Sequence, residues 1–131
     1  HGLLDRVQPV MDKNELLAMQ QEVDNIYMSD DIMRYIVSLS QATRQEPRFA
    51  LGLSPRGSLA VAGMARAAAY LAGREFVAPQ DVTAIFVDAA HHRLRLTEQA
   101  QTAGETVENV LNDLLHTVPR PRPEKGGRHG R

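Results

Sequence analysis

Residues 54–57, with the sequence Ser-Pro-Arg-Gly, form the arrangement in this chain that most favours anion binding. Ser54 is a typical N-cap residue and Pro55 is favoured at the first helical position, so the pair predicts a helix start. Arg56 then lies in the first turn, where a cation opposes the helix dipole by about 0.3–1 kcal/mol. An anion arriving there would meet free backbone N–H groups and a guanidinium able to bind phosphate oxygens. The residues alone leave open the alternative of a surface arginine that tolerates this penalty.

A phosphate loop of the form GxxxxGK[ST] is absent from the sequence. The chain has two lysines, Lys13 and Lys125, and glycine precedes neither. In that motif the backbone cradles the phosphates and the lysine reaches them. We therefore expect that this chain cannot hold a nucleotide in that manner, or hydrolyse one, by itself.

Few residues in the sequence favour a metal site or a catalytic nucleophile. Residues 85–88 superficially resemble the apolar strand and Asp that hold magnesium, but they follow a helix start at Pro79, so Asp88 is predicted to be a solvated helix residue. His91 and His92 are adjacent, and adjacent side chains point in different directions. We expect them to suit the end of a helix and predict no metal site. The absence of cysteine excludes a thiolate nucleophile and a disulfide framework.

The composition favours packed helices in one domain. Aromatic residues make up only 5% of the 131 residues, and Trp is absent, so the core must be aliphatic. No apolar run approaches the length of a membrane helix, which is about 20 residues, and we expect a cytoplasmic protein. Residues 119–131 contribute +4 to a net charge of −1, which leaves −5 on the rest. An acidic body makes nucleic-acid binding unexpected.

Helix start and stop signals predict an all-α fold, a small bundle of about five helices with room for one short two-stranded β pairing. The third helix holds seven Ala between residues 59 and 72, so we place it at the centre of the bundle. Residues 94–96 alternate, and we expect them to pair with the segment around Phe76. Residues 97–105 are predicted to be a polar connection. The predicted helices cover residues 12–27, 29–44, 54–72, 79–91 and 106–117.

Residues 51–59 resemble the second-sensor segment of MoxR-family AAA+ ATPases. Three further pieces, residues 7–10, residues 35–44, and residues 73–82 followed by 92–93, are similar to that family in the same order and spacing, so the resemblance covers roughly residues 5–118. Two positions depart from the family pattern. Leu53 stands where the family commonly has Ala, and Ala78 stands where it usually has a capping Thr. Loss of that cap, worth about 1 kcal/mol, is expected to fray the fourth helix.

This resemblance implies that residues 1–118 form a C-terminal AAA+ lid and that residues 119–131 are a disordered tail rich in Pro, Arg and Gly. It implies that ATP, with Mg²⁺, binds between the lid and an N-terminal AAA+ core that this chain lacks. Arg56 would approach the terminal phosphate and sense its hydrolysis. Ser54 and Pro55 would set the helix start, and Gly57 would give clearance.

The same resemblance implies a homo-oligomeric ring, commonly hexameric, with a chaperone-like role in maturing partner proteins or inserting metal or cofactors into them. Proteins with von Willebrand factor A domains are frequent partners in that family. The chain starts at His1 without an initiator methionine, and we expect a fragment or a processed chain. The alternative is a free-standing helical module that binds protein or DNA, although no basic recognition helix is evident.

Overall fold

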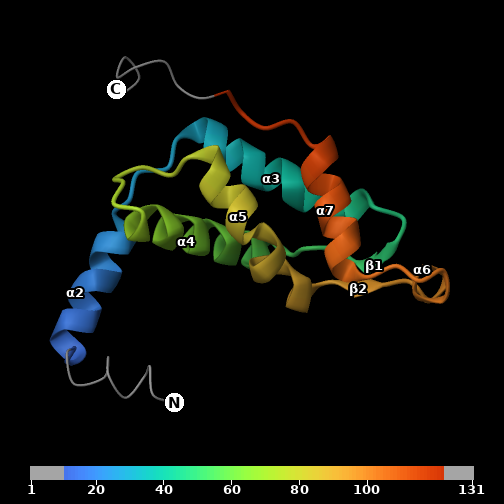
Figure 1. Cartoon of the computed structure of the whole chain (residues 1–131), viewed down its shortest axis with the longest axis horizontal. Helices are drawn as coiled ribbons and strands as arrows, with labels where there is room; N and C mark the ends of the chain where they lie inside the picture. Colours follow the sequence, from blue (N-terminus) through green and yellow to red (C-terminus); the bar gives the residue numbers. More distant parts are fainter. Residues whose placement is uncertain (1–10, 123–131) are drawn as a thin grey trace.

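The computed structural model describes residues 11–122 of the chain. In this part, six α-helices are accompanied by a short two-stranded sheet at one end of the bundle (Figure 1), which confirms the predicted all-α fold with one β pairing. The predicted family segment at residues 7–10 and most of the predicted tail, residues 123–131, lie outside the described residues. The elements are α2 (Lys13–Asp24), α3 (Asp30–Gln45), β1 (Phe49–Leu51), α4 (Pro55–Leu71), α5 (Pro79–Ala90), the 3₁₀ helix η2 (His91–Arg93), β2 (Arg95–Leu96), α6 (Glu98–Thr102) and α7 (Val107–Thr117).

Helix α4 lies at the centre of the bundle, as predicted, and contacts α2, α3 and α5. Its buried stripe runs through Val61, Ala65 and Ala69, which are completely buried at a spacing of four residues. Because two of these side chains are single methyl groups, α5 can approach the α4 backbone closely. Phe86 of α5 and Leu39 of α3 are fully buried and fill the space around this contact.

The sheet pairs β1 with β2 in antiparallel fashion, with Phe49 opposite Leu96. We expected β2 to pair with the segment around Phe76, and that prediction is wrong. Phe76 instead forms an isolated parallel bridge with Tyr27, where the N–H of Val77 donates to the Tyr27 carbonyl oxygen at 2.9 Å. Alternation of side chains identifies a short strand, but its partner depends on how distant segments pack.

Helix α2 begins with the predicted capping box. Asp12 Oδ1 accepts from the Glu15 N–H at 2.8 Å, and Glu15 Oε1 accepts from the Asp12 N–H at 2.9 Å. The helix ends at Asp24, slightly earlier than expected, and it buries no residue. Leu16 of the predicted apolar stripe is 52% exposed, whereas Ile26, beyond the helix end, is buried. Helix α2 therefore lies at the edge of the bundle (Figure 1).

The predicted polar connection before α7 contains one short helix, α6, which the sequence analysis missed. Thr97 caps it by accepting the Ala100 N–H at 3.1 Å, and Ala100 is buried. Gly104 follows with φ +89°, a left-handed conformation that favours glycine. A helix of little more than one turn is too short for side-chain periodicity to reveal.

The start of α5 lacks a capping side chain, as expected from Ala78. However, Asp81 Oδ2 accepts the Ala78 N–H at 2.7 Å, and Arg74 donates to both oxygens of Asp81. Asp81 is buried among these donors. The Arg74–Asp81 pair stabilises the start of α5. Our expectation of fraying did not include this contact, because it forms only in the folded chain.

Candidate functional site

The start of α4 has the local structure that Ser54 and Pro55 predicted. Ser54 is extended, with φ −77° and ψ 166°, and its Oγ accepts the Gly57 N–H at 3.1 Å. Pro55 occupies the first helical position, where a missing N–H costs nothing. Arg56 therefore lies in the second helical position, and its side chain is exposed.

Most N–H groups at this helix start are already used, contrary to our expectation of several free ones. Pro55 has no N–H, that of Gly57 donates to Ser54 Oγ, and that of Ser58 donates to the Ser54 carbonyl oxygen at 2.9 Å. The N–H of Arg56 has no acceptor among residues 11–122. An anion at this site would thus be met by one amide and one guanidinium, both from Arg56.

Several other arginines have protein partners, whereas Arg95, Arg120 and Arg122, like Arg56, have none among residues 11–122. Arg48 pairs with Glu46 at 2.8 Å, Arg74 pairs with Asp81, and Arg93 Nη1 donates to the Ala89 carbonyl oxygen at 2.8 Å. Within the described part of the chain, the Arg56 guanidinium makes neither an ion pair nor a hydrogen bond. Its charge therefore stands uncompensated beside the positive end of a helix dipole, an arrangement suited to a phosphate group.

The absence of a side chain at Gly57 leaves space for other residues of this chain to pack. A Cβ at this position would collide with the Leu53 side chain and lie 3.2 Å from Arg93 Cδ. Leu53 is fully buried and occupies the space that a side chain at residue 57 would need. The clearance that we expected at Gly57 therefore allows residues of this chain to pack against it.

Two residues of α3 hold the segment before Ser54, and the sequence analysis gave neither a role. Thr43 Oγ1 accepts the Leu53 N–H at 2.9 Å, and Arg44 Nη1 donates to the Leu53 carbonyl oxygen. Residues 42–44 contributed to the family resemblance, which was the available signal. Spacing along the chain could not reveal that they meet Leu53, because the contact spans a turn and β1.

The remaining candidate groups do not assemble into a site. Asp88 lies in α5, so its segment is a helix, as predicted, and not a metal-binding strand. Its side chain is exposed. His91 Nδ1 lies 3.3 Å from the Val87 carbonyl oxygen, and His91 Nε2 lies 3.9 Å from Glu108. Residues 11–122 hold no group of three or more His, Cys, Asp or Glu side chains placed to bind a metal ion.

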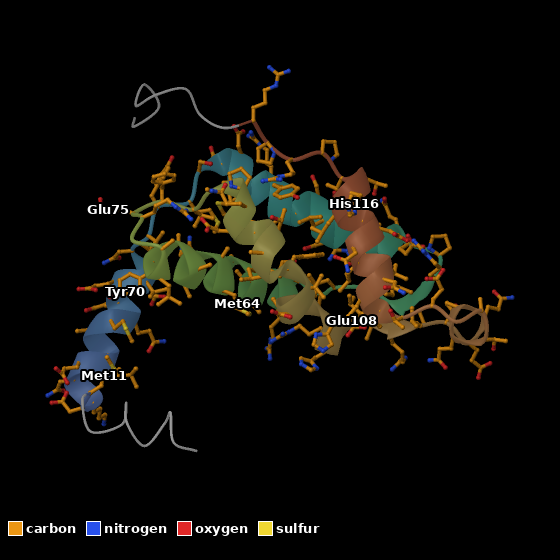
Figure 2. The ribbon with its side chains drawn as sticks, viewed as in Figure 1. Met11, Met64, Tyr70, Glu75, Glu108 and His116 are labelled. Carbon is orange, nitrogen blue, oxygen red and sulfur yellow. The ribbon has the colours of Figure 1, made fainter. Side chains whose placement is uncertain are left out.

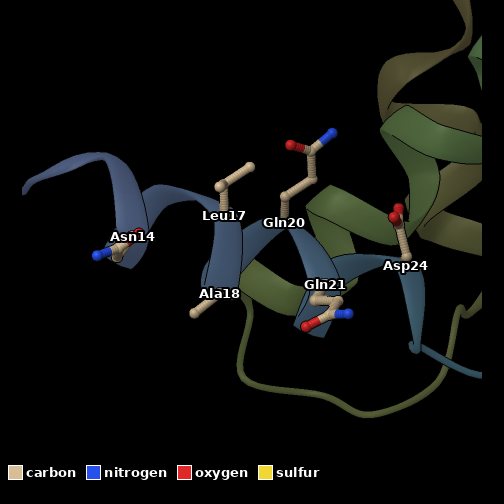
Figure 3. Close-up of a pocket in the computed structure, with 6 residues that line it drawn as sticks. All are labelled: Asn14, Leu17, Ala18, Gln20, Gln21 and Asp24. Carbon is tan, nitrogen blue, oxygen red and sulfur yellow. The ribbon is translucent and has the colours of Figure 1, made fainter.

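A shallow hollow on α2 also lies away from Arg56. Tyr70, near the C-terminal end of α4, donates to Glu22 at 2.6 Å (Figure 2), so α2 lies at the end of α4 opposite to Arg56. The side chains that line the hollow come from α2 alone and do not converge on one point (Figure 3). They are Asn14, Leu17, Ala18, Gln20, Gln21 and Asp24. We assign no chemistry to this surface.

No helix in the described part of the chain has the length and apolar character needed to cross a membrane. Several large apolar side chains are nevertheless exposed. On α4, Leu59 is 74% exposed and Leu71 is 82% exposed. They lie at opposite ends of the helix as single exposed side chains, so they do not define one apolar patch.

Comparison with known proteins agrees with the earlier resemblance. A family model described as the AAA lid domain matches residues 41–114. The uncharacterized protein YeaC of Bacillus subtilis is 35% identical over 118 residues, which are 90% of this chain and 37% of YeaC. Chaperone MoxR1 of Mycobacterium tuberculosis is 32% identical over 130 residues, covering 89% of this chain and 34% of MoxR1. The MoxR protein of Paracoccus denitrificans is 32% identical in an alignment of 109 positions that covers 72% of this chain and 32% of that protein.

The fold is also similar to part of a crystal structure. A candidate ATPase of Cytophaga hutchinsonii matches with a TM-score of 0.79 and 24% identity, over 84% of this chain and 36% of that one. At this identity the match supports the fold alone. The chain spans about a third of the length of the curated relatives that it matches.

Proposed function

The chain belongs to the AAA lid domain family, in which it is a lid of the MoxR type, and on this premise we propose that it closes over ATP and senses the terminal phosphate through Arg56. The position of Arg56 carries this proposal. Its guanidinium is exposed at the start of α4 and is unpaired within residues 11–122. A nucleotide-binding core, with the phosphate loop that this sequence lacks, would come from the remaining two-thirds that the relatives have.

The chemistry proposed for Arg56 is electrostatic. In the proposed closed state, its guanidinium and its backbone N–H face oxygens of the terminal phosphate, where the charge is concentrated before hydrolysis. Ser54 and Pro55 act indirectly by fixing the helix start, and Gly57 acts by allowing Leu53 to pack beneath it. When hydrolysis releases the terminal phosphate, Arg56 loses its partner, and an interaction that stabilises the closed lid is lost.

Magnesium would enter this site with ATP and be held from the side of the core. The residues near Arg56 fit phosphate oxygens, because they offer a cation and an amide donor. They do not fit a divalent cation, which prefers carboxylate and carbonyl oxygens. We therefore assign ATP contacts to this chain and Mg²⁺ ligands to the core.

For the whole protein we propose a chaperone-like AAA+ ATPase that assembles into a ring, commonly a hexamer, in the cytoplasm. The name of the similar MoxR1 protein, a chaperone, supports that role. Maturation of partner proteins, insertion of metal or cofactors, and binding to proteins with von Willebrand factor A domains follow from the family resemblance.

The test is Arg56→Ala in a full-length protein that includes the core. We expect ATP turnover to fall by about tenfold or more, because a phosphate contact made during the reaction is lost. The matched control is Arg34→Ala, since Arg34 is an exposed arginine in the second turn of α3 that pairs only weakly with Asp31 at 3.6 Å. Circular dichroism should show both variants folded. Unchanged turnover in folded Arg56→Ala would remove the sensor role.

A further inference from the structure

Leu53, directly before the cap of α4, is fixed at both of its backbone polar groups by the last turn of α3. Thr43 Oγ1 accepts the Leu53 N–H at 2.9 Å while donating to the Ser40 carbonyl oxygen at 2.6 Å. Arg44 Nη1 donates to the Leu53 carbonyl oxygen. Thr43 and Leu53 are completely buried, so water cannot replace the hydroxyl as the acceptor of this N–H.

Two further contacts tie α3 to the start of α4. A Cβ at Gly52 would lie 2.6 Å from Arg44 Cα, so the chain passes α3 at a distance that only glycine allows. One turn into α4, the hydroxyl oxygens of Ser40 and Ser58 lie 2.6 Å apart. The segment that carries Arg56 is thus held against α3 on both of its sides.

We propose that Thr43 and Arg44 are positioning residues that direct the Arg56 side chain toward bound nucleotide, an inference that rests on the proposed sensor role of Arg56. Both act through Leu53, three residues before Arg56, and neither is expected to touch the nucleotide. Pairing of a guanidinium with a phosphate depends on orientation as well as distance. Loosening Leu53 would therefore tilt the start of α4 and misdirect Arg56 without removing it.

The experiment measures the dissociation constants of ATP and ADP in a full-length protein that includes the core. Their ratio isolates the terminal phosphate, since ADP lacks it. Arg56→Ala should abolish most of the preference for ATP. Thr43→Val, which keeps the side-chain shape but removes the acceptor, should reduce the preference about three- to tenfold. Thr43→Ser keeps the oxygen and should retain the preference of the parent protein.

A double variant tests whether Thr43 acts through Arg56. With Ala at position 56, Thr43→Val should cause no further change in the ratio. An equal change in both backgrounds overturns the proposal. The proposal is also overturned if folded Thr43→Val keeps the ATP-to-ADP affinity ratio of the parent protein while Arg56→Ala has lost the preference for ATP.

Arg44→Met is the second variant, and it decides the matter if Thr43→Val does not fold. Arg44 is exposed, and methionine keeps an apolar stem while removing the donor to Leu53. We expect a smaller loss of preference in the same direction, and a wild-type ratio contradicts the proposal. If Arg56→Ala itself leaves the ratio unchanged, the proposed sensor function fails, which is a different result from failure of the positioning role.

Discussion

Arg74 donates two hydrogen bonds, of 2.5 and 2.8 Å, to the carboxylate of Asp81 at the buried start of α5. The same carboxylate accepts the Ala78 N–H at 2.7 Å. Burial raises the pKa of Asp81, but the hydrogen bonds from Arg74 and Ala78 outweigh burial and hold this pKa below its ordinary value of 3.8. A salt bridge that forms only when Asp81 is ionised makes stability depend on pH.

Acidification should therefore weaken the fold through Asp81. Because the pKa is lowered in the folded state, the stabilisation is complete above pH 3.8 and is lost as pH falls through the folded pKa. Asp81→Asn should lower the free energy of unfolding at pH 7 by about 1–3 kcal/mol. Urea unfolding across pH 2–7 should show the difference between parent and variant shrinking below about pH 4. A difference that stays constant over this range would contradict the assigned role.

Gly57→Ala should destabilise the lid by about 1–3 kcal/mol, because the added methyl group collides with the fully buried Leu53. The matched control is Gly63→Ala on the same helix, where no atom lies within 4 Å of the new methyl group. That change should be neutral or stabilising by up to about 1 kcal/mol. Thermal unfolding of both variants measures the contrast.

Leu53→Ala and Gly57→Ala should be energetically coupled, since Leu53→Ala removes the side chain that the new methyl group meets. Each single variant is expected to be less stable than the parent protein, and the double variant should lose less than their sum. A double-mutant cycle by urea unfolding measures this coupling. Strict additivity would show that Gly57 is required for another reason.

Arg48→Ala should cost about 1–2 kcal/mol, because one guanidinium joins three separate carboxylates. Arg48 lies 2.8 Å from Glu46, 3.0 Å from Asp113 and 3.4 Å from Glu105, which ties the loop before β1 to α7. Its hydrogen bond to Glu46 lowers the pKa of that carboxyl group. Unfolding at low and high salt should show the loss shrinking with salt, and a loss no larger than that of Arg34→Ala would show that the network contributes little.

Ala78→Ser should stabilise the lid by up to about 1 kcal/mol, because the new hydroxyl can share the Asp81 N–H, which now donates to the Ala78 carbonyl oxygen at 2.9 Å, and complete a capping box. Serine adds a single oxygen at a buried site, so it is a smaller change than the threonine common in the family. Thermal unfolding measures the gain. No gain would show that Arg74 and Asp81 already supply all the stabilisation available at this helix start.

Five of the six α-helix starts in the described part of the chain, and the all-α fold, could be predicted from the sequence. The capping box of Asp12 and Glu15 and the Ser54-Pro55 start were predicted because capping involves residues within one turn of each other. The central place of α4 was predicted from its alanines. The candidate anion-binding residue, Arg56, was likewise found from its place beside a cap.

The contacts between these elements could not be predicted from local sequence. Strand β2 pairs with β1 and not with the Phe76 segment, the Leu53 side chain fills the space beside Gly57, and Thr43 Oγ1 accepts the backbone N–H of Leu53. These contacts join segments that are separated along the chain by a turn, a strand or a whole helix. Local propensity cannot specify them, because they form only when the bundle packs and each buried polar group must find a partner.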